Sequence, residues 1–343
     1  MLTFVFILSN YNNKIMKRIA INGFGRIGKV VTRLIQDNNN IELVAINDLA
    51  DTKTLAHLLK YDSIHGIFNG TVEYTAEALI INGKKVTVCK EKSPENLPWA
   101  ALNIDIVVEC TGLFLTKESA NKHLIAGAKK VLLSAPAKDE DIKTIVIGVN
   151  EHLLKTSDTI ISNASCTTNA VAPMIKLLDD NFGIEQANIT TVHSYTNDQG
   201  LHDAPHKDLR RARAGALSII PTSTGAAKAI TKIFPTLEGK TEGYAIRVPV
   251  PDGSLIDVCA IVKKEATVKS INNVFLNASQ KEMHHILEYT IDEIVSHDIV
   301  GNRNSCIFDS NLTSVTGKLV KIVGWYDNEV GYSSRLIDVI EIY

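Results

Sequence analysis

The sequence predicts an α/β protein of two domains: a doubly wound domain built on a parallel sheet, followed by an α+β domain with a largely antiparallel sheet. Three observations predict this. The chain has 343 residues, a length typical of two domains. Up to about residue 163, short apolar strands alternate with stretches that are long enough for crossovers. After residue 163 the predicted strands become longer, and loops replace the alternation of strands with crossover stretches.

The first domain begins with a short β-branched strand at residues 18–22, which a glycine-rich turn follows. From Ile27 to Ile35 the apolar residues recur at positions i, i+3, i+4, i+7 and i+8, which predicts one face of a helix. A second buried strand covers residues 41–47 and ends before Asp48. Later apolar runs predict further parallel strands at residues 104–108, 130–133 and 144–147.

The second domain is predicted to contain strands at residues 188–192, 243–250, 256–263 and 318–325. Residues 331–340 are predicted to form a helix that returns to the first domain. We therefore expect one domain at 16–163, joined by the C-terminal helix 331–343, and another at 164–330.

Residues 1–15 differ from the rest of the chain, because an apolar run at 2–8 precedes a polar patch. A signal peptide would carry positive charge before its apolar run, but the first lysine, Lys14, comes after it. We expect an extension, disordered or a misassigned start, with Met16 as the natural beginning; export is the alternative.

The overall composition excludes several classes of protein. Lysine and arginine number 36 against 38 acidic residues, so no basic excess predicts a dedicated nucleic-acid partner. No apolar run approaches the roughly 18–20 residues that cross a bilayer, so no membrane partner is expected. The five cysteines are scattered and form neither a disulfide framework nor a metal-ligand spacing. A reducing, cytoplasmic location without a metal site fits best.

A dinucleotide fingerprint lies between the first predicted strand and helix. Gly23, Gly25 and Gly28 form the G-x-G-x-x-G pattern, which permits a tight turn and brings backbone N–H groups close to a pyrophosphate. Asp48 ends the second strand, where its carboxylate would accept from ribose hydroxyls and repel the extra phosphate of NADP. The first domain is therefore predicted to be a Rossmann domain that binds NAD; a strand–turn–helix without ligand is the alternative.

Cys166 is the strongest candidate nucleophile. It stands among polar residues in Ser162–Asn169, just where an apolar helix begins. The positive end of the helix dipole is expected to lower the pKa of a thiol there. Pro173 leaves the Asn169 carbonyl without its helical donor, which predicts a kink early in this helix. The other four cysteines are interpreted as small buried apolar residues.

His193 is the candidate base for this thiol. It lies at the end of the predicted strand 188–192, 27 residues after Cys166. An imidazole near its ordinary pKa can accept the thiol proton and later exchange protons with substrate oxygen. The alternative is a histidine that is buried and satisfied in the core.

Motifs along the chain resemble those of phosphorylating glyceraldehyde-3-phosphate dehydrogenases. In order from about residue 17, the similar segments are INGFGRIG, INDL, YDSIHG, ASCTTN, HSYTNDQ, DLRRARA, IIPTSTGAAKA, RVPVPDGS and WYDNEVGYS. The resemblance implies a Rossmann domain and a catalytic domain, bound NAD and a homotetramer. It also implies glycolytic oxidation of glyceraldehyde 3-phosphate with inorganic phosphate, through a hemithioacetal and a thioester.

The same resemblance assigns residues to roles. Cys166 would be the nucleophile and His193 the acid/base. The dinucleotide would be held by the glycine loop and by Arg26, Ile27, Asp48, Lys92, Ser134 and Asn328, the last at the nicotinamide amide. One anion subsite would consist of Ser165, Thr167, Thr224 and Gly225, and the other of Thr196, Arg211 and Arg247.

Some of these assignments have independent support. Arg247 interrupts an apolar strand, so its buried charge needs a phosphate or a carboxylate. Thr224 and Gly225 precede a predicted helix at 226–233 and offer a hydroxyl and amides to an anion, although an ordinary helix cap fits equally well.

Two alternative functions stay open: erythrose-4-phosphate oxidation, and redox sensing through Cys166.

Overall fold

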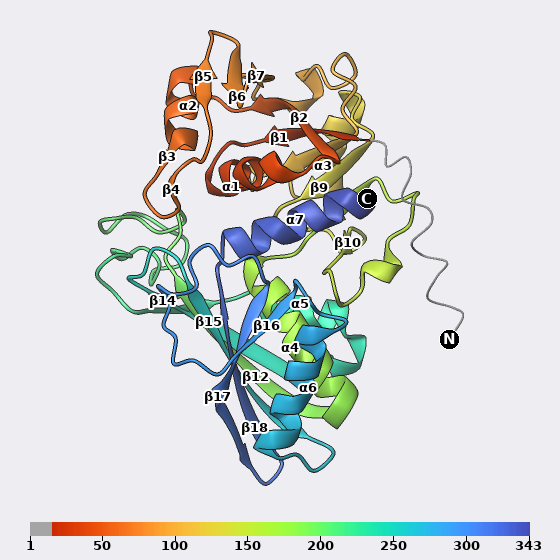
Figure 1. The fold of residues 1–343 in the computed structure, drawn as a ribbon, viewed down its shortest axis with the longest axis vertical. Helices are drawn as coiled ribbons and strands as arrows, with labels where there is room; N and C mark the ends of the chain where they lie inside the picture. The colour runs from red at the N-terminus through yellow and green to blue at the C-terminus, as the bar shows by residue number, and fades with distance from the viewer. Residues whose placement is uncertain (1–15) are drawn as a thin grey trace.

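The structure is a computed structural model that describes residues 16–343, with one large sheet in each half of the chain (Figure 1). The extension expected at residues 1–15 lies outside the described residues. The predicted fold class is confirmed, because the first sheet is mostly parallel and the second mostly antiparallel.

The first sheet has the strand order β10-β11-β9-β8-β1-β2-β7-β6-β5. Its strands are β1 (Lys17–Asn22), β2 (Ile41–Asn47), β5 (Val72–Tyr74), β6 (Ala78–Ile81), β7 (Lys84–Cys89), β8 (Ile106–Glu109), β9 (Lys130–Leu133), β10 (Lys143–Thr144) and β11 (Ile160–Ser162). A small hairpin of β3 (Tyr61–Asp62) and β4 (Gly66–Ile67) stands apart from this sheet. β5 and β6 are antiparallel additions at one edge.

β1 is the switch point of this sheet, because it pairs in parallel with β2 on one side and with β8 on the other. The chain leaves β1 toward one side and leaves β8 toward the other, and such a divergence opens a crevice at the carboxyl ends of the strands. The helices of this domain are α1 (Arg26–Leu34), α2 (Thr52–Lys60) and α3 (Lys117–Ile125).

The second sheet has the strand order β13-β14-β12-β15-β18-β17-β16. Its strands are β12 (Ile184–Ser194), β13 (Ile220–Ser223), β14 (Thr241–Val248), β15 (Ser254–Val262), β16 (Leu287–Thr290), β17 (Cys306–Thr316) and β18 (Leu319–Tyr326). Only the β12–β14 and β16–β17 pairs are parallel. One face packs against α4 (Cys166–Phe182), α5 (Ala226–Ile233) and α6 (Val268–Gln280) (Figure 1).

The last helix, α7 (Val330–Ile342), packs on α1 of the first domain and also contacts α4 (Figure 1). Leu336, Val339 and Ile340 of α7 are buried in the same apolar cluster as Ile19 and Ile21 of β1. A second cluster lies between α4, α6 and the second sheet, where the Phe275 and Phe308 rings stack with centroids 3.9 Å apart. The core therefore fixes α7 and the start of α4 at the junction of the domains.

One local prediction needs correction. The strand expected at residues 144–147 is only Lys143–Thr144, because Val146 is the start of a turn in which its carbonyl accepts from the Val149 and Asn150 amides. α4 is continuous from Cys166 to Phe182 with Pro173 inside it, and the kink expected near Pro173 stays a prediction.

Within residues 16–343 there is no helix whose length and apolar character would suit a membrane span.

Candidate active site

A cavity of about 670 Å³ lies between the two domains, at the carboxyl ends of the first sheet's strands. The glycine loop, the ends of β8, β9 and β12, and the first residues of α4 and α7 contribute to its wall. Ten of the predicted site residues line it: Gly25, Arg26, Ile27, Ser134, Ser165, Cys166, His193, Thr196, Arg247 and Asn328. Residues from sequence positions 25 to 328 thus meet in one space.

The glycine loop has the geometry that a dinucleotide requires. Gly23 has φ +92°, a conformation that side chains disfavour, and a Cβ there would lie 2.8 Å from Thr111 in the loop after β8. A Cβ on Gly28 would stand 2.4 Å from the Gly23 carbonyl oxygen, so this position also excludes a side chain. No atom lies within 4 Å of the Cβ position of Gly25, which lines the cavity. A phosphate can therefore approach the backbone at Gly25.

Asp48 supports this loop from the end of β2. Its carboxylate accepts from the Phe24 amide at 2.8 Å and from the Ala50 amide at 3.0 Å. Asp48 stands beside the glycine loop but is not part of the cavity wall, and Lys92 is exposed and also outside the wall.

A buried polar network holds the strand ends beneath the loop. Glu109, at the end of β8, accepts from Asn22 Nδ2 at 2.6 Å and from the Thr111 amide at 2.7 Å. His123 Nε2 lies 3.1 Å from the same carboxylate, and Trp99 Nε1 donates to His123 Nδ1 at 3.1 Å. Because Nδ1 accepts from Trp99, Nε2 carries the proton and donates to Glu109. No sequence pattern indicates this network, since its members are far apart in the chain.

Asn328 is oriented toward the cavity by two hydroxyl groups. Ser194 Oγ donates to its Oδ1 at 2.6 Å, and Ser254 Oγ donates to the same oxygen at 2.9 Å. With the carbonyl end fixed, the NH₂ end is the part that can donate to a ligand, as an acceptor such as a carboxamide oxygen would require. Ser134 also lines the cavity, and its hydroxyl donates to the Glu109 carbonyl at 2.8 Å.

Cys166 is the first residue of α4, as the sequence predicts for the helix start. Ser165 caps the helix, with its Oγ accepting from the Thr168 amide at 3.1 Å. Ala164 has φ +55°, an uncommon conformation for a residue with a side chain, and Tyr332 of α7 donates to its carbonyl at 3.0 Å. The C-terminal helix therefore helps to hold the sharp turn that presents Cys166.

The thiol and the imidazole are in contact. Cys166 Sγ lies 3.4 Å from His193 Nε2, at the end of β12. His193 Nδ1 lies 2.7 Å from the Ser194 carbonyl oxygen and 2.6 Å from Arg247 Nη1. The Tyr326 ring packs edge-on against the imidazole at a centroid distance of 5.9 Å. These contacts fix the ring with Nε2 directed at the sulfur.

The expected pKa values of this pair need correction. Burial raises the pKa of the Cys166 thiol, and this outweighs the lowering by the Arg247 charge and by hydrogen bonds from Thr167 and the helix N-terminus. Burial, and then the Arg247 charge, lower the pKa of His193 to about 3. Without ligands both shifts favour a neutral thiol beside a neutral imidazole. His193 is thereby kept in the form that can accept a proton.

The residues predicted to bind anions fall into two groups. Thr196 and Arg247 line the cavity, as does Ser165. Arg247 donates to the Ser194 carbonyl at 2.9 Å, but its buried Nε has no partner among the described residues, and none of their carboxylates pairs with it. A buried, unpaired guanidinium hydrogen is what an anion subsite requires.

Four of the predicted anion-binding residues do not line the cavity. Arg211 instead pairs with Asp198 at 2.5 Å and donates to Thr222 at 2.9 Å. Thr167 is buried, with its hydroxyl 3.0 Å from Tyr326 Oη. The others are Thr224 and Gly225, which precede α5 as predicted.

Several residues of the wall were not singled out from the sequence. They include Cys110, Thr111, Tyr195, Asp198, Glu329 and Tyr332. Asp198 and Tyr195 are close to His193 in sequence, so their neighbourhood was a usable signal. Cys110 and Thr111 follow β8, and only the pairing of β8 with β1 brings them to the glycine loop.

Comparison with known proteins identifies both halves of the chain. The family model "Glyceraldehyde 3-phosphate dehydrogenase, NAD binding domain" matches residues 17–117, and the model of the C-terminal domain of the same enzyme matches residues 165–328. The first match makes NAD the cofactor of this chain.

Curated relatives match over nearly the whole length. Glyceraldehyde-3-phosphate dehydrogenase 2 of Streptomyces avermitilis is 55% identical over 325 residues, which cover 94% of this chain and 97% of the relative. The enzyme of Thermotoga maritima is 56% identical over 330 residues, with 95% and 99% covered. That of Geobacillus stearothermophilus is 53% identical over 324 residues, with 94% and 96% covered. The chain belongs to the glyceraldehyde 3-phosphate dehydrogenase family.

Proposed function

We propose that this chain catalyses the NAD-dependent oxidative phosphorylation of D-glyceraldehyde 3-phosphate to 1,3-bisphosphoglycerate in glycolysis. The observation that carries the proposal is the 3.4 Å contact between Cys166 Sγ and His193 Nε2 in a cavity that extends to the glycine loop. A nucleophile, a base and a dinucleotide site in one space are the parts that thiol-dependent aldehyde oxidation needs.

The reaction begins at the sulfur. Cys166 Sγ forms a bond to the aldehyde carbon as His193 Nε2 takes the thiol proton and passes it to the aldehyde oxygen, which gives a hemithioacetal. NAD, when bound, supplies the two-electron acceptor that removes hydrogen from this carbon. His193 accepts the hydroxyl proton in that step, so the carbon becomes the carbonyl of a thioester.

The product is released when inorganic phosphate attacks the thioester. An oxygen of inorganic phosphate bonds to the thioester carbon, the carbon–sulfur bond breaks, and His193 returns its proton to the sulfur. The products are an acyl phosphate and free Cys166. Two anions must therefore be held, the phosphate of the aldehyde and the attacking phosphate.

The two anion subsites follow from the residues around Cys166. We assign Thr196, Arg211 and Arg247 to one and Ser165, Thr167, Thr224 and Gly225 to the other. The unpaired buried Nε of Arg247 supports the first subsite. To bind an anion, Arg211 would have to give up its contact with Asp198. Thr167 would likewise have to give up its contact with Tyr326.

The cofactor contacts are proposed along the rest of the cavity. The backbone of Gly23, Gly25, Arg26, Ile27 and Gly28 would hold the pyrophosphate at the start of α1. Asp48 would accept from the ribose hydroxyls, and Ser134 and Asn328 would contact the nicotinamide half. Lys92 would act at the adenine end; its exposed position outside the wall gives it the weakest support.

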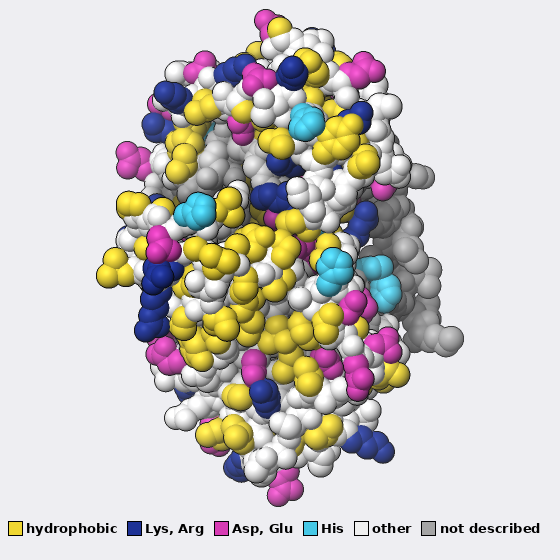
Figure 2. All heavy atoms as spheres, turned by 90° about the vertical axis from the view of Figure 1, so that its left-hand side faces the viewer, with side chains coloured by type: hydrophobic (Ala, Val, Ile, Leu, Met, Phe, Trp, Pro, Cys, Tyr) yellow, Lys and Arg dark blue, Asp and Glu magenta, His cyan; other side chains and the backbone are white. Residues whose placement is uncertain are grey.

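A homotetramer in the cytoplasm is proposed for the assembled enzyme. Apolar side chains gather across the middle of one side of the molecule (Figure 2). Leu209, Leu217 and Ile219 are 82%, 81% and 71% exposed, an arrangement that favours burial against other copies of the chain. All five cysteines are free, which favours a reducing compartment.

The test is NADH absorbance with glyceraldehyde 3-phosphate. We expect sustained turnover with NAD and phosphate, and about one equivalent of NADH per active site when phosphate is omitted, since the thioester then accumulates. NADP is expected to give kcat/KM at least about tenfold lower than NAD, because Asp48 repels its extra phosphate. Failure to reduce NAD, undiminished turnover without phosphate, or a preference for erythrose 4-phosphate would contradict the proposal.

A further inference from the structure

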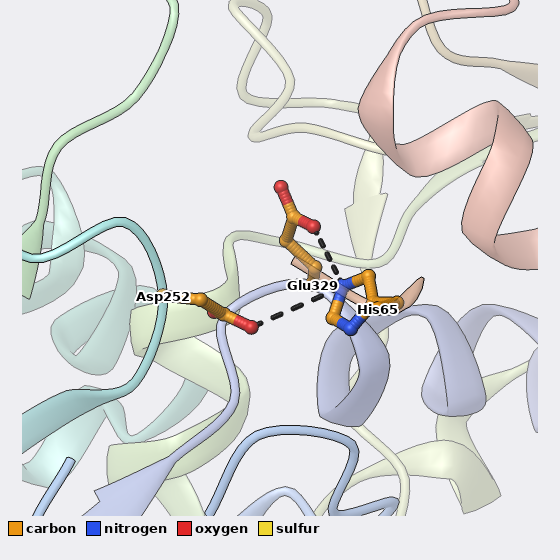
Figure 3. A group of neighbouring side chains, drawn as sticks. All are labelled: His65, Asp252 and Glu329. Atoms are coloured by element: carbon orange, nitrogen blue, oxygen red, sulfur yellow. Dashed lines mark hydrogen bonds and ion pairs between the residues drawn. The ribbon is translucent and has the colours of Figure 1, made fainter. Parts of the chain in front are cut away.

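Three ionisable side chains meet at the junction of the two domains (Figure 3). His65 lies in the turn between β3 and β4, Asp252 in the loop between β14 and β15, and Glu329 just before α7. His65 Nε2 is 2.8 Å from Glu329 Oε2 and 3.9 Å from Asp252 Oδ2. The side chains are 8%, 10% and 1% exposed for His65, Glu329 and Asp252, respectively. Figure 3 shows both carboxylates directed toward the same imidazole nitrogen.

Asp252 is the unusual member of this group. Neither of its carboxylate oxygens has a hydrogen-bond partner among the described residues, although the residue is only 2% exposed. A buried carboxylate is costly unless it is paired or binds a metal. The group that faces the Asp252 carboxylate is His65 Nε2, which is 3.9 Å from Oδ2 and so beyond hydrogen-bond distance.

Two cations of the first domain, Arg26 and Lys29, act on Asp62 and Glu329. Arg26 donates to both carboxylate oxygens of Glu329 and pairs with Asp62 at 2.5 Å. Asp327 is also buried, and its oxygens accept from the Gly301, Glu329 and Val330 amides.

The charges of this neighbourhood do not balance. If all were ionised, four carboxylates, those of Asp62, Asp252, Asp327 and Glu329, would face Arg26, Lys29 and His65, the last charged only when protonated. The residual charge is then one or two negative units, which a divalent cation would offset. A cation at the point where His65, Asp252 and Glu329 converge would do so without displacing Arg26 from Glu329.

We propose that His65 Nε2, one Asp252 carboxylate oxygen and Glu329 Oε2 bind a divalent first-row transition-metal ion. The three ligand atoms lie within 4.8 Å of one another. Ligand atoms that are about 2.0–2.2 Å from one ion are roughly 2.9–3.6 Å apart, so small side-chain rotations would suffice. Coordination replaces the Nε2 proton with the ion, and His65 binds as a neutral imidazole. One imidazole with two carboxylates suits Mn²⁺, Fe²⁺ or Zn²⁺ better than Mg²⁺ or Ca²⁺.

The sequence gives no signal for this site, because the ligands are at positions 65, 252 and 329, without a short motif. The ion would link the first domain, through His65, to two segments of the second. It would also fix Glu329, which lines the cofactor cavity and holds Arg26. The inference is independent of the proposed function.

Binding can be tested with the full-length protein after EDTA treatment and gel filtration. Mn²⁺ titration followed by electron paramagnetic resonance counts bound ions, and Zn²⁺ titration in a Cys166→Ser background avoids the reactive thiol. We expect one ion per chain and a melting temperature that rises with added metal by mass action. The Asp252→Asn variant should weaken binding by at least about 100-fold, since it replaces a carboxylate ligand with a neutral amide.

The controls separate the site from general effects. Asp257→Asn, in the same domain and paired with Lys321 at 2.8 Å, should respond to metal like wild type. His65→Gln provides a second ligand variant if Asp252→Asn folds poorly, and it should also lose binding. Absence of a bound Mn²⁺ or Zn²⁺ ion at millimolar metal would overturn the proposal. Binding that both ligand variants retain would overturn it as well.

Discussion

Cys166→Ser is expected to lower aldehyde-dependent NADH formation by at least about 10⁴-fold, because a serine hydroxyl in this position is a far weaker nucleophile than a thiol. The affinity for NAD should change little, since Asn328 and the glycine loop contact the cavity independently of the sulfur. Steady-state absorbance at saturating substrate measures the first quantity, and fluorescence titration with NAD measures the second.

Cys110→Ser is the matched control, because Cys110 lines the same cavity. Burial raises the pKa of Cys110 to about 12, so it stays a thiol. Its replacement should leave kcat within a few-fold of wild type. Substantial activity in Cys166→Ser, or an equal loss in Cys110→Ser, would remove Cys166 from the role of nucleophile.

His193→Gln is expected to lower kcat/KM by about 10²–10⁴-fold, the range that a positioned acid/base contributes. Glutamine can fill much of the space near Sγ but cannot take the thiol proton. The rate at which iodoacetamide alkylates Cys166 should fall with kcat/KM, because the same proton must leave before the sulfur reacts. Stopped-flow absorbance and a timed alkylation assay provide the two rates.

His152→Gln serves as the control for this substitution, since His152 is exposed and outside the cavity wall. In His152→Gln, both kcat/KM and the alkylation rate of Cys166 should match those of wild type. A His193→Gln enzyme with slow turnover but normal alkylation would mean that His193 positions substrate and does not act on the thiol.

The fold was largely predictable because its signals are local. The strand–glycine loop–helix pattern located β1, α1 and β2, and the apolar stripe after Cys166 located α4. The edge strands β5 and β6 were missed: β5 has three residues and is largely exposed, and β6, although apolar and mostly buried, has only four residues. Residues 145–147 were assigned to a strand because all three are apolar, and the turn buries Ile145 and Val146 as completely as a strand would.

The site was predictable where residue chemistry and motif coincide, as at Cys166, His193 and the glycines. The direction of the pKa shift of the Cys166 thiol was not predictable. The helix dipole favours the thiolate, but burial opposes it and is the larger effect in the structure. Burial depth depends on how the two domains close over the cavity, which no local pattern reveals. The same holds for the Glu109 network and for the His65, Asp252 and Glu329 cluster, whose members meet only in the folded chain.

The most direct test mixes the enzyme with NAD and glyceraldehyde 3-phosphate without inorganic phosphate, quenches in acid, and maps the acyl group by peptide mass spectrometry. One acyl group per chain on the peptide that contains Cys166, formed with one equivalent of NADH and lost when phosphate is added, is the result expected if this sulfur carries the reaction. NADH formation without a covalent group, or an acyl group on Cys110 in place of Cys166, would contradict it.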